Sequence, residues 1–472
     1  MSYGVYLALV VVLCLALVWW LKLNSLYILF TFAFVQNLVL PFMYTSLGSS
    51  RDLLLGLLLF KEILLLLLFF YCTHLWSELH RAWPKPLFVL FLFTLYCVSR
   101  VSVGLLVLHD DPYESFRKLR MVCFPLEILT VAVTVGAIRP KFATKFLKHQ
   151  TYLLAFLGLI GILLFLMPSK DFWASRANIA TYSIDIKGDD PFYYVEDQGV
   201  SGTGLARDVF LDLSSFRAMG TFGDPLAMSF AMTAPILLLV FVYKRTWCTP
   251  LLFLTLGIAL LFTFSRSAWI FVFAGGIYIL FRKRKYSWLI AFAVIPILAI
   301  VTIRPLADFA VEGWQALSWT NPGGEHAEGI VWFYKRAFID WGNILGKGMR
   351  DEVQFIPESG YAFLLEHFGL AAYVTWLWFL LSLYRHLRLR DTGPAKLPLV
   401  SEAMVLGTFI VVHFSQYPFS FIGWLPIWYV FGLSMASAPV RVKSMRGVAA
   451  VALRQVPLLP GAASGEPATG RG

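Results

Sequence analysis

The stretch LLLGLLLFKEILLLLLFFYCT, residues Leu53 to Thr73, carries only two charged side chains, Lys61 and Glu62. A helix needs about 20 mostly apolar residues to cross the hydrocarbon core of a bilayer, so this stretch predicts a membrane-spanning helix. Similar runs recur along the chain near 4–22, 26–46, 53–73, 86–108, 121–138, 150–168, 224–242, 249–264, 267–281, 287–304, 358–384, 398–415 and 420–438. The chain is therefore predicted to be an all-α polytopic membrane protein with about 12–13 transmembrane helices.

The composition supports the same class of protein. Of the 472 residues, 59% are hydrophobic and 14% are charged, and the mean hydropathy is +0.72. Soluble domains have about 25% charged residues, so an ordinary soluble enzyme is excluded. No small-residue cleavage site follows the first apolar run, 5–21, and we expect a retained span rather than a signal peptide. The five cysteines form no CxxC pair, which argues against disulfides and a thiolate metal site.

Short basic clusters indicate which ends of the spans face the cytoplasm. The clearest are FRKRK at Phe281–Lys285 and YRHLRLR at Tyr384–Arg390. Placing both inside also places the clusters near 139–148, 244–245 and 441–446 there. This positive-inside pattern accounts for the formal charge of +11 without a nucleic-acid partner.

The outer face receives the long connections of the chain, which exceed the ~15 residues beyond which a loop usually has a function. HDDPYESFRKLR, His109 to Arg120, and the turn Phe264–Ser267 lie on the same face. The predicted organisation is 1–168 N-terminal transmembrane helices, 169–223 first long outer loop, 224–304 central transmembrane helices, 305–357 second long outer loop, 358–440 C-terminal transmembrane helices and 441–472 cytoplasmic tail. The tail from Gln455 is rich in Pro, Gly, Ala and Ser, and we expect it to be disordered.

Ionisable side chains gather at the outer ends of several spans. Arg217 leads into one span, and Arg266 lies in a very short Ser-Arg-Ser turn next to a helix N-terminus. Lys347 and Arg350 precede the span that Glu358 begins. An arginine beside free N–H groups forms an anion site. Taken singly, Arg266 is equally compatible with an anion site or with a contact to lipid headgroups, and Arg217 with an anion site or with an ordinary loop charge.

The stretch ESGYAFLLEHFGL contains two candidates for proton transfer. Glu358 shares one helical face with Tyr361, whereas His367 lies near the opposite side. A helix N-terminus stabilises a carboxylate in its charged form, which makes Glu358 a credible general base. We interpret His367 as a hydrogen-bonded packing residue, with a direct role as the alternative.

Lys61 and Glu62 form a charged pair in the middle of a predicted span. Such a pair is either structural, each charge neutralising the other, or part of a transport relay. We favour the structural pair, because we expect no other ionisable group at the middle of a span to continue a relay.

Three segments in the second half of the chain share a recognisable pattern. They are RAMGTFGDPLAMSFAM (Arg217–Met232), FTFSRSAWIFVFAGGI (Phe262–Ile277), and GKGM followed by ESGYAFLLEHFGL (Gly346–Leu370). Together they resemble the O-antigen ligase/polymerase superfamily of polytopic bacterial glycosyltransferases of the GT-C type. The resemblance implies an inner-membrane enzyme that uses polyprenyl-pyrophosphate-linked glycans on the periplasmic side. It covers roughly 217–369, and the serine–arginine turn with its downstream span is its most specific part.

The resemblance also implies roles for individual residues. Arg217 and Arg266 match the outer-face arginines that are thought to bind the donor pyrophosphate, with Arg350 and Arg120 as weaker candidates. Glu358 occupies the position where ligases typically carry a histidine that activates the acceptor hydroxyl.

The local motif resembles that of polymerases more than that of ligases. Glu358-Ser359-Gly360-Tyr361 with Phe368-Gly369 fits the acidic version of the motif rather than His-Asn-x-Tyr-Leu. The resemblance therefore implies a polymerase that joins lipid-linked repeat units of O-antigen, capsule or exopolysaccharide, with Glu358 as base and with Ser359 and Tyr361 near the acceptor sugar. A ligase that transfers glycan to lipid A core or protein is one alternative. A non-enzymatic flippase or transporter of lipid-linked sugars is the other.

Neither a metal nor a cofactor is expected. The sequence contains no HExxH, DxD or Cys/His cluster, and arginines stabilise a departing pyrophosphate without a metal. Enzymes of the GT-C type that use monophosphate donors carry an acidic pair in the first outer loop, which here is only about 47–52 with one acid. Asp110-Asp111 lies in the following outer loop and matches less well.

The expected partners are the lipid-linked donor and acceptor and the bilayer, with a chain-length regulator and a flippase as further candidates. The expected location is the bacterial inner membrane, with the active site facing the periplasm and the C-terminus in the cytoplasm.

Overall fold

The computed structural model describes residues 3–79, 82–166, 182, 185–186, 206–210, 213–216, 220–222, 224–244, 246–263, 265–291, 294, 302, 344–348, 359–389, 396–413, 415 and 417–436. The chain divides into two compact units, Met1–Ser437 and Ala438–Gly472. The second unit, with the predicted tail 441–472, lies outside the described residues, as do most of the predicted loops 169–223 and 305–357 and of the predicted span 287–304.

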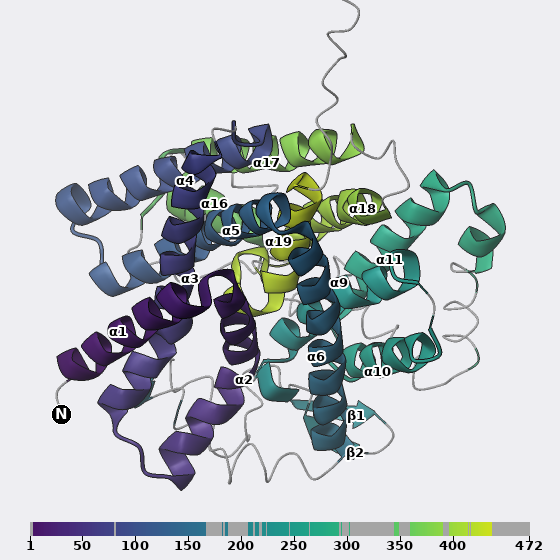
Figure 1. Ribbon diagram of the computed structural model, residues 1–472, viewed down its shortest axis with the longest axis horizontal. Coiled ribbons are helices and arrows are strands. Elements are labelled where there is room, and N and C mark those ends of the chain that lie inside the picture. The colour runs from purple at the N-terminus through teal and green to yellow at the C-terminus, as the bar shows by residue number, and fades with distance from the viewer. Residues whose placement is uncertain are drawn as a thin grey trace, which may run out of the picture. The chain divides into compact units, whose positions relative to one another are not determined.

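The first unit is built from helices, which Figure 1 colours in chain order. They are α1 (Tyr3–Leu21), α2 (Ser25–Ser46), α3 (Arg51–Glu78), α4 (Lys85–Val103), α5 (Pro112–Ile138), α6 (Pro140–Leu166), α9 (Pro225–Phe241), α10 (Thr249–Phe262), α11 (Arg266–Arg282), α16 (Gly360–Phe368), α17 (Leu370–Arg388), α18 (Lys396–Val411) and α19 (Phe421–Ala436). Single 3-10 or π turns occupy Lys22–Asn24, Gly104–Leu108, Gly220–Phe222 and Tyr417–Phe419.

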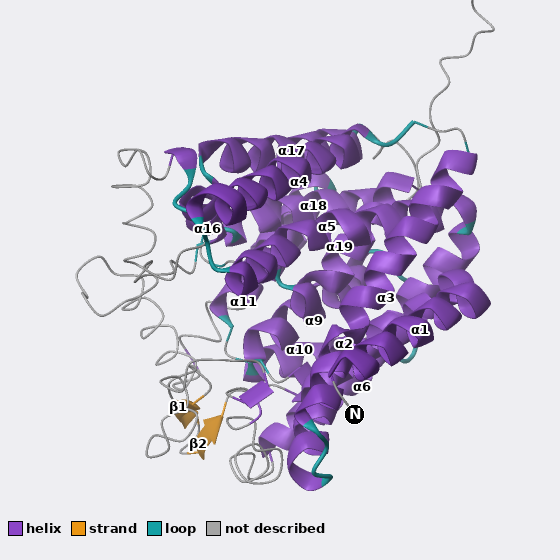
Figure 2. Ribbon diagram, turned by 90° about the vertical axis from the view of Figure 1, so that its left-hand side faces the viewer, coloured by secondary structure: helices purple, strands orange, loops and turns teal. Residues whose placement is uncertain are grey.

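A small antiparallel ribbon interrupts this helical pattern. Strands β1 (Ala206–Phe210) and β2 (Leu213–Phe216) pair within the predicted first outer loop, where Figure 2 draws them in orange. The predicted all-α class is confirmed for the described residues apart from this ribbon.

Five helical runs are long and apolar enough to cross a membrane by length and composition. They are Tyr3–Thr45, Arg51–Glu78, Lys85–Val107, Pro112–Ile138 and Pro140–Leu166. Helices α9, α10 and α19 are shorter and also apolar. The first run contains both α1 and α2, which meet at the 3-10 turn and diverge from it in Figure 1.

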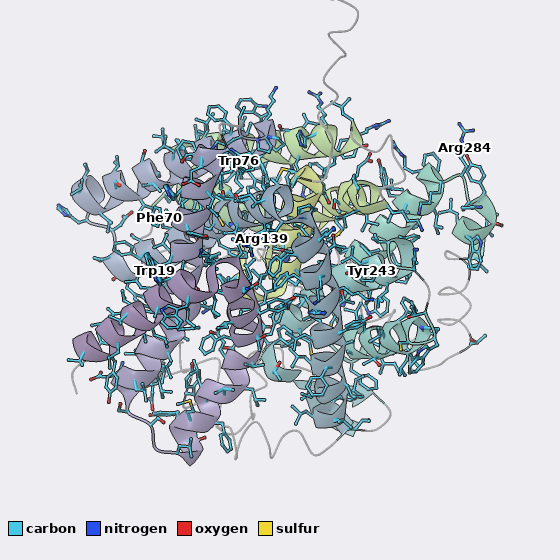
Figure 3. The ribbon with its side chains drawn as sticks, in the orientation of Figure 1. Trp19, Phe70, Trp76, Arg139, Tyr243 and Arg284 are labelled. Carbon is cyan, nitrogen blue, oxygen red and sulfur yellow. The ribbon has the colours of Figure 1, made fainter. Side chains whose placement is uncertain are left out.

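The surface of this unit carries large apolar side chains. Trp19 is 80% exposed and Phe70 is 59% exposed, and both are labelled among the side chains in Figure 3. Soluble monomers rarely expose contiguous apolar surface on this scale, whereas lipid covers it in a bilayer. The apolar runs and this surface together identify the chain as a helical polytopic membrane protein.

Helix α5 is the most buried of the five runs, and it packs against α3, α4, α6 and α19. Figure 1 shows α5 and α19 next to each other. Charged side chains in the first turns of α5 line one cavity with residues from the starts of α3 and α19.

Serine and aspartate caps explain where five helices begin. The capping side chains are Ser50 for α3, Asp111 for α5, Asp224 for α9, Ser265 for α11 and Ser359 for α16. Each accepts a hydrogen bond from a backbone N–H two or three residues further on, which satisfies a donor that the helix itself leaves unpaired. All five caps lie at the ends predicted to face outward, so the positive ends of these helix dipoles lie on one predicted face.

In the structure α5 begins earlier in the chain than the sequence predicted. We expected a loop over His109–Arg120, but α5 begins at Pro112, so this prediction was wrong from Pro112 onward. Asp111 caps the helix and Pro112 occupies its first position, where a proline loses no hydrogen bond. Arg117 and Arg120 therefore project from a helix and not from a loop.

The predicted span 358–384 is broken into two helices. Helix α16 ends at Phe368, α17 begins at Leu370, and Gly369 between them has a φ of +87°. A Cβ at Gly369 would lie 2.7 Å from the carbonyl oxygen of Ile344, so only glycine fits this backbone crossing. The nine-residue α16 is thereby fixed against residues 344–346.

Candidate functional site

A cavity of about 1050 Å³ lies where the first turns of α3, α5 and α16 meet the start of α19. Its ionisable residues are Arg51, Lys61, Glu62, Arg117, Lys118, Arg120, Asp224 and His367. Its apolar and aromatic residues include Tyr3, Leu55, Leu58, Tyr113, Phe116, Phe363 and Phe421. We call it the charged cavity. Five basic side chains against two carboxylates favour an anionic ligand, and the apolar wall suits a ligand with a hydrocarbon part.

A network of ion pairs joins α3 to α5 at the side of the charged cavity. Arg120 pairs with Glu62 through Nε, and its Nη1 lies 2.8 Å from Glu127 Oε2. Lys61 Nζ lies 3.3 Å from Glu62 Oε1. Lys61 and Arg120 also lie over the ring of Phe421, with Nζ and Cζ 5.6 and 5.9 Å from its centroid. The predicted structural pair of Lys61 and Glu62 is present, and it belongs to a larger network.

Glu127 was missed at the sequence level. It lies near the middle of α5 and inside the predicted span 121–138, so the expectation that no other ionisable group stands at the middle of a span was wrong. A signal existed, because residues seven apart lie on one face of a helix and Arg120 precedes Glu127 by that spacing. Glu402, fully buried in α18 and bound by the Tyr278 hydroxyl, is a second such group.

The first turns of α5 form a basic edge of the charged cavity. Arg117 Nη2 lies 2.7 Å from Glu114 Oε2, and Lys118 Nζ lies 3.9 Å from the same oxygen. Arg51 faces the cavity from the first turn of α3. One carboxylate thus balances two cations of α5, and the edge keeps a positive excess.

His367 lines the charged cavity, although its side chain is almost fully buried. Its Nδ1 lies 2.9 Å from the carbonyl oxygen of Gly348. A carbonyl oxygen only accepts, so Nδ1 carries the proton and Nε2 keeps its lone pair. Among the described residues Nε2 has no hydrogen-bond partner. The interpretation of His367 as hydrogen-bonded is confirmed, but it leaves a basic nitrogen beside the cavity.

The two parts of the third segment that carries the family resemblance pack against each other around this histidine. Gly346 and Gly348 have φ values of +83° and +84°, and the amide of Lys347 donates to the carbonyl of Glu366 at 2.6 Å. Arg100 from α4 holds the turn, with its Nη2 2.7 Å from the carbonyl oxygen of Gly346. The GKGM turn and the end of α16 therefore form one unit.

Asp110 and Asp111, which match the acidic pair of GT-C enzymes less well, both make structural contacts. A Cβ on Gly348 would lie 2.6 Å from Asp110 Oδ2, so the buried Asp110 carboxylate lies against that glycine. Asp111 caps α5.

Other residues expected at the site are not among the residues that line the charged cavity. Arg266 is the first residue of α11, directly after the Ser265 cap, as the serine–arginine turn predicts. Ser359 caps α16 and its hydroxyl donates to the Val412 carbonyl at 3.3 Å. Tyr361 is fully buried, and its hydroxyl donates to the Phe409 carbonyl at 3.2 Å.

Three further expected site residues, Arg217, Arg350 and Glu358, lie outside the described residues. Where the chain is described, no group of three or more His, Cys, Asp or Glu residues is placed to hold a metal ion.

No protein-family model, curated protein or solved structure matches this chain. The relation to O-antigen ligases and polymerases therefore stays a resemblance of motifs. A functional assignment has to rest on these motifs and on the geometry of the charged cavity.

Proposed function

We propose that this protein is a membrane glycosyltransferase that polymerises polyprenyl-pyrophosphate-linked oligosaccharide repeat units. The observation that supports it most is the charged cavity, which combines five basic side chains with an apolar wall in a membrane protein. A polyprenyl pyrophosphate has the matching chemistry, a dianionic or more highly charged head on a hydrocarbon chain. The proposed location is the bacterial inner membrane, with this cavity on the periplasmic side.

Basic side chains would stabilise the leaving group. The acceptor hydroxyl attacks the anomeric carbon, the bond from that carbon to the pyrophosphate oxygen breaks, and its electron pair leaves with the pyrophosphate. Arg51, Arg117 and Lys118 supply positive charge where this negative charge develops. The capped first turns of α3, α5 and α16 add partial positive charge from their N–H groups. Direct displacement inverts the anomeric configuration.

Arg120 has a different part in this proposal. Its guanidinium already lies between Glu62 and Glu127, so it orients the cavity wall rather than offering an unpaired charge to the donor. Arg217, Arg266 and Arg350 remain proposed pyrophosphate ligands on the resemblance alone.

A base has to take the proton of the acceptor hydroxyl. His367 is the candidate among the described residues, because its Nε2 keeps a lone pair beside the cavity. Glu358, proposed from the sequence, is the second candidate, one residue before the Ser359 cap. The two carboxamide variants described below separate them.

A ligase is the second candidate function, and His367 favours it. The family's ligases are thought to activate their acceptor with a histidine at the position of Glu358, and here the imidazole of His367, whose buried Nε2 has no hydrogen-bond partner among the described residues, lines the cavity instead. Gel profiles of surface glycans distinguish the two: loss of a polymerase leaves single repeats attached, whereas loss of a ligase leaves no attached glycan.

The network of Lys61, Glu62, Arg120 and Glu127 is the observation that favours a transporter. An extension assay decides between enzyme and transporter. The full chain, purified in detergent, is mixed with a defined polyprenyl-pyrophosphate repeat unit, and products are resolved by length. We expect a ladder of longer glycans, and the ladder should shorten or vanish in Lys118→Gln but persist in Lys285→Gln, an exposed lysine at the opposite predicted face. If the folded wild-type protein returns only the single repeat unit, the polymerase is excluded.

A further inference from the structure

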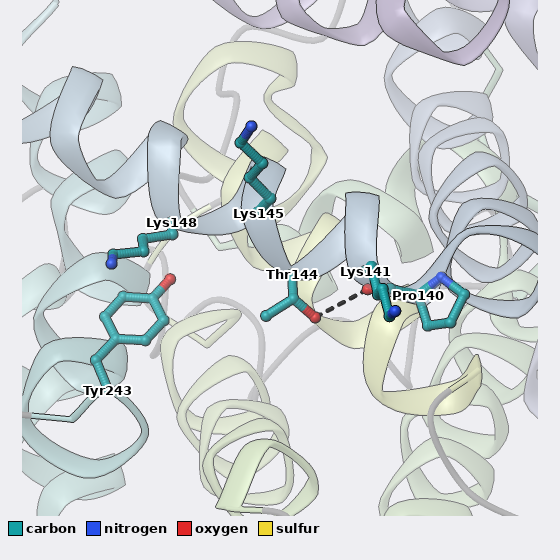
Figure 4. A pocket seen from close by; sticks show the side chains of 6 residues that line it. All are labelled: Pro140, Lys141, Thr144, Lys145, Lys148 and Tyr243. Atoms are coloured by element: carbon teal, nitrogen blue, oxygen red, sulfur yellow. Dashed lines mark hydrogen bonds between the residues drawn. The ribbon is translucent and has the colours of Figure 1, made fainter.

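A second groove, of about 590 Å³, lies between the first turns of α6 and the residues that follow α9 (Figure 4). It is lined by Pro140, Lys141, Thr144, Lys145, Lys148 and Tyr243. We call it the lysine groove. It shares no residue with the charged cavity, and its lysines belong to a cluster predicted to face the cytoplasm.

The helix period places the three lysines on one face. Lys141, Lys145 and Lys148 are spaced i, i+4 and i+7, and all three are exposed. Neither α6 nor α9 contains an aspartate or a glutamate. The positive charges of the groove therefore have no carboxylate on the helices that build it.

This arrangement is unfavourable in isolation. Lys141 and Lys145 lie in the first two turns of α6, where the positive end of the helix dipole disfavours cations. Like charges at i, i+4 also repel each other. A bound anion offsets both effects, because it is attracted to the lysines and to the helix N-terminus together.

An aromatic residue shapes the other side of the groove. Tyr243 points toward α6 in Figure 4, and its hydroxyl lies 3.2 Å from Thr151 Oγ1. Thr144 uses its hydroxyl to bond the Pro140 carbonyl at 2.9 Å, the dashed line in Figure 4. These contacts position the walls of the groove, and the three lysines supply its positive charge.

The surface that continues from the lysines along α6 is apolar. Along the same face of α6 follow Tyr152, Phe156, Leu159 and Leu163, which are 40, 58, 43 and 47% exposed. Lys148 Nζ lies 5.7 Å from the Tyr152 ring centroid, which joins the charged part of this face to the apolar part. A soluble anion would use only the lysines, whereas a lipid with an anionic head uses the whole face.

We propose that the lysine groove binds the headgroup of an anionic phospholipid. The phosphate lies among Lys141, Lys145 and Lys148, and the acyl chains run along Phe156, Leu159 and Leu163. Basic pockets between transmembrane helices on the cytoplasmic side are suited to this chemistry. The site is independent of the function proposed for the charged cavity.

The test compares two variants that lose the same charge. One replaces the groove lysines (K141Q/K145Q/K148Q), and the control replaces three exposed lysines predicted on the same membrane side (K22Q/K85Q/K396Q). The purified full chain is titrated with phosphatidylglycerol and, separately, phosphatidylcholine in detergent, and bound lipid is counted by native mass spectrometry. Each lysine should contribute about five-fold in affinity, so the groove variant should bind phosphatidylglycerol on the order of 100-fold more weakly. The control should match the wild type.

Three outcomes would overturn the proposal. They are unchanged phosphatidylglycerol binding in the groove variant, an equal loss in both variants, and displacement of the lipid by millimolar inorganic phosphate. Two further variants, Lys148→Gln and the charge-preserving K141R/K145R/K148R, distinguish a loss of lipid binding from misfolding of the triple variant. The first should bind about five-fold more weakly, and the second should keep the preference for phosphatidylglycerol.

Discussion

Arg120 is the residue whose environment differs most from its expected role. The sequence suggested an arginine exposed in an outer loop, whereas the structure holds it between Glu62 on α3 and Glu127 on α5. Removing one partner from a mostly buried ion pair leaves a charge without compensation. The network should therefore matter for stability before it matters for catalysis.

We expect Glu127→Gln to lower the free energy of unfolding by about 1–3 kcal/mol, because Arg120 then retains only Glu62. Thermal unfolding of the purified protein in detergent measures the effect. Glu78→Gln is the control, since the Glu78 side chain is 60% exposed and its contact with His74 is a surface pair, for which less than about 1 kcal/mol is expected. Equal melting temperatures for Glu127→Gln and the wild type would show that the network does not stabilise the fold.

His367 provides the residue-scale prediction for catalysis. If its Nε2 is the base, His367→Gln should reduce the rate of glycan extension by about 10²–10⁴-fold with little change in KM. His149→Gln is the control, because His149 is exposed and pairs with the Tyr27 hydroxyl at 3.0 Å away from the charged cavity.

Glu358→Gln, measured in the same assay, identifies the base. If only Glu358→Gln loses glycan extension, Glu358 is the base and His367 is a packing residue. A loss confined to His367→Gln would exclude Glu358 as the base.

At the scale of elements, the sequence pattern did not predict the crossing of the GKGM turn and the end of α16. Hydropathy treated 358–384 as one apolar run, because a single glycine hardly changes a window of about 20 residues. The break at Gly369 follows instead from a backbone contact with Ile344, which is distant in sequence. Such a contact is a tertiary effect, and a local reading of the chain has no means of including it.

Substitution of this glycine should be costly. Gly369→Ala combines a φ of +87° with a Cβ 2.7 Å from a carbonyl oxygen, and we expect it to destabilise the protein by more than about 1 kcal/mol. Gly257→Ala in α10 is the matched control, since its new methyl would have no atom within 4 Å and alanine favours the helix. Melting temperatures of the two variants should move in opposite directions, and a neutral Gly369→Ala would mean that the crossing can relax.

At the scale of the whole molecule, most spans could be predicted because about 20 apolar residues in a row have few other solutions. The predicted and observed limits of α1, α2 and α9 agree to within a few residues. The start of α5 at Asp111-Pro112 could be predicted from capping rules, which a hydropathy pattern does not include. The grouping of Arg51, Glu62 and His367 could not be predicted from the sequence, because it depends on how helices far apart in sequence pack.

The sidedness inferred from basic clusters can be tested directly. In a cysteine-free background, Tyr113→Cys should react with a membrane-impermeant maleimide in intact cells, because Tyr113 is 62% exposed at the predicted outer end of α5. Lys285→Cys, also exposed, should react only after the membrane is permeabilised. The opposite labelling pattern would invert the topology and place the charged cavity in the cytoplasm.

The pairing of α3 with α5 also sets an order for biogenesis. Glu62 and Arg120 are 58 residues apart, and a ribosome adding about 5–20 residues per second needs about 3–12 s between them. During that interval Lys61 and Glu62 lie near the middle of α3, and Arg120 is not yet present to pair with Glu62. Inserting a charged residue at the centre of a helix into the bilayer costs about 2.5–3.5 kcal/mol. We therefore expect α3 to remain beside the translocon until α5 emerges, so that the two helices enter the lipid as a pair.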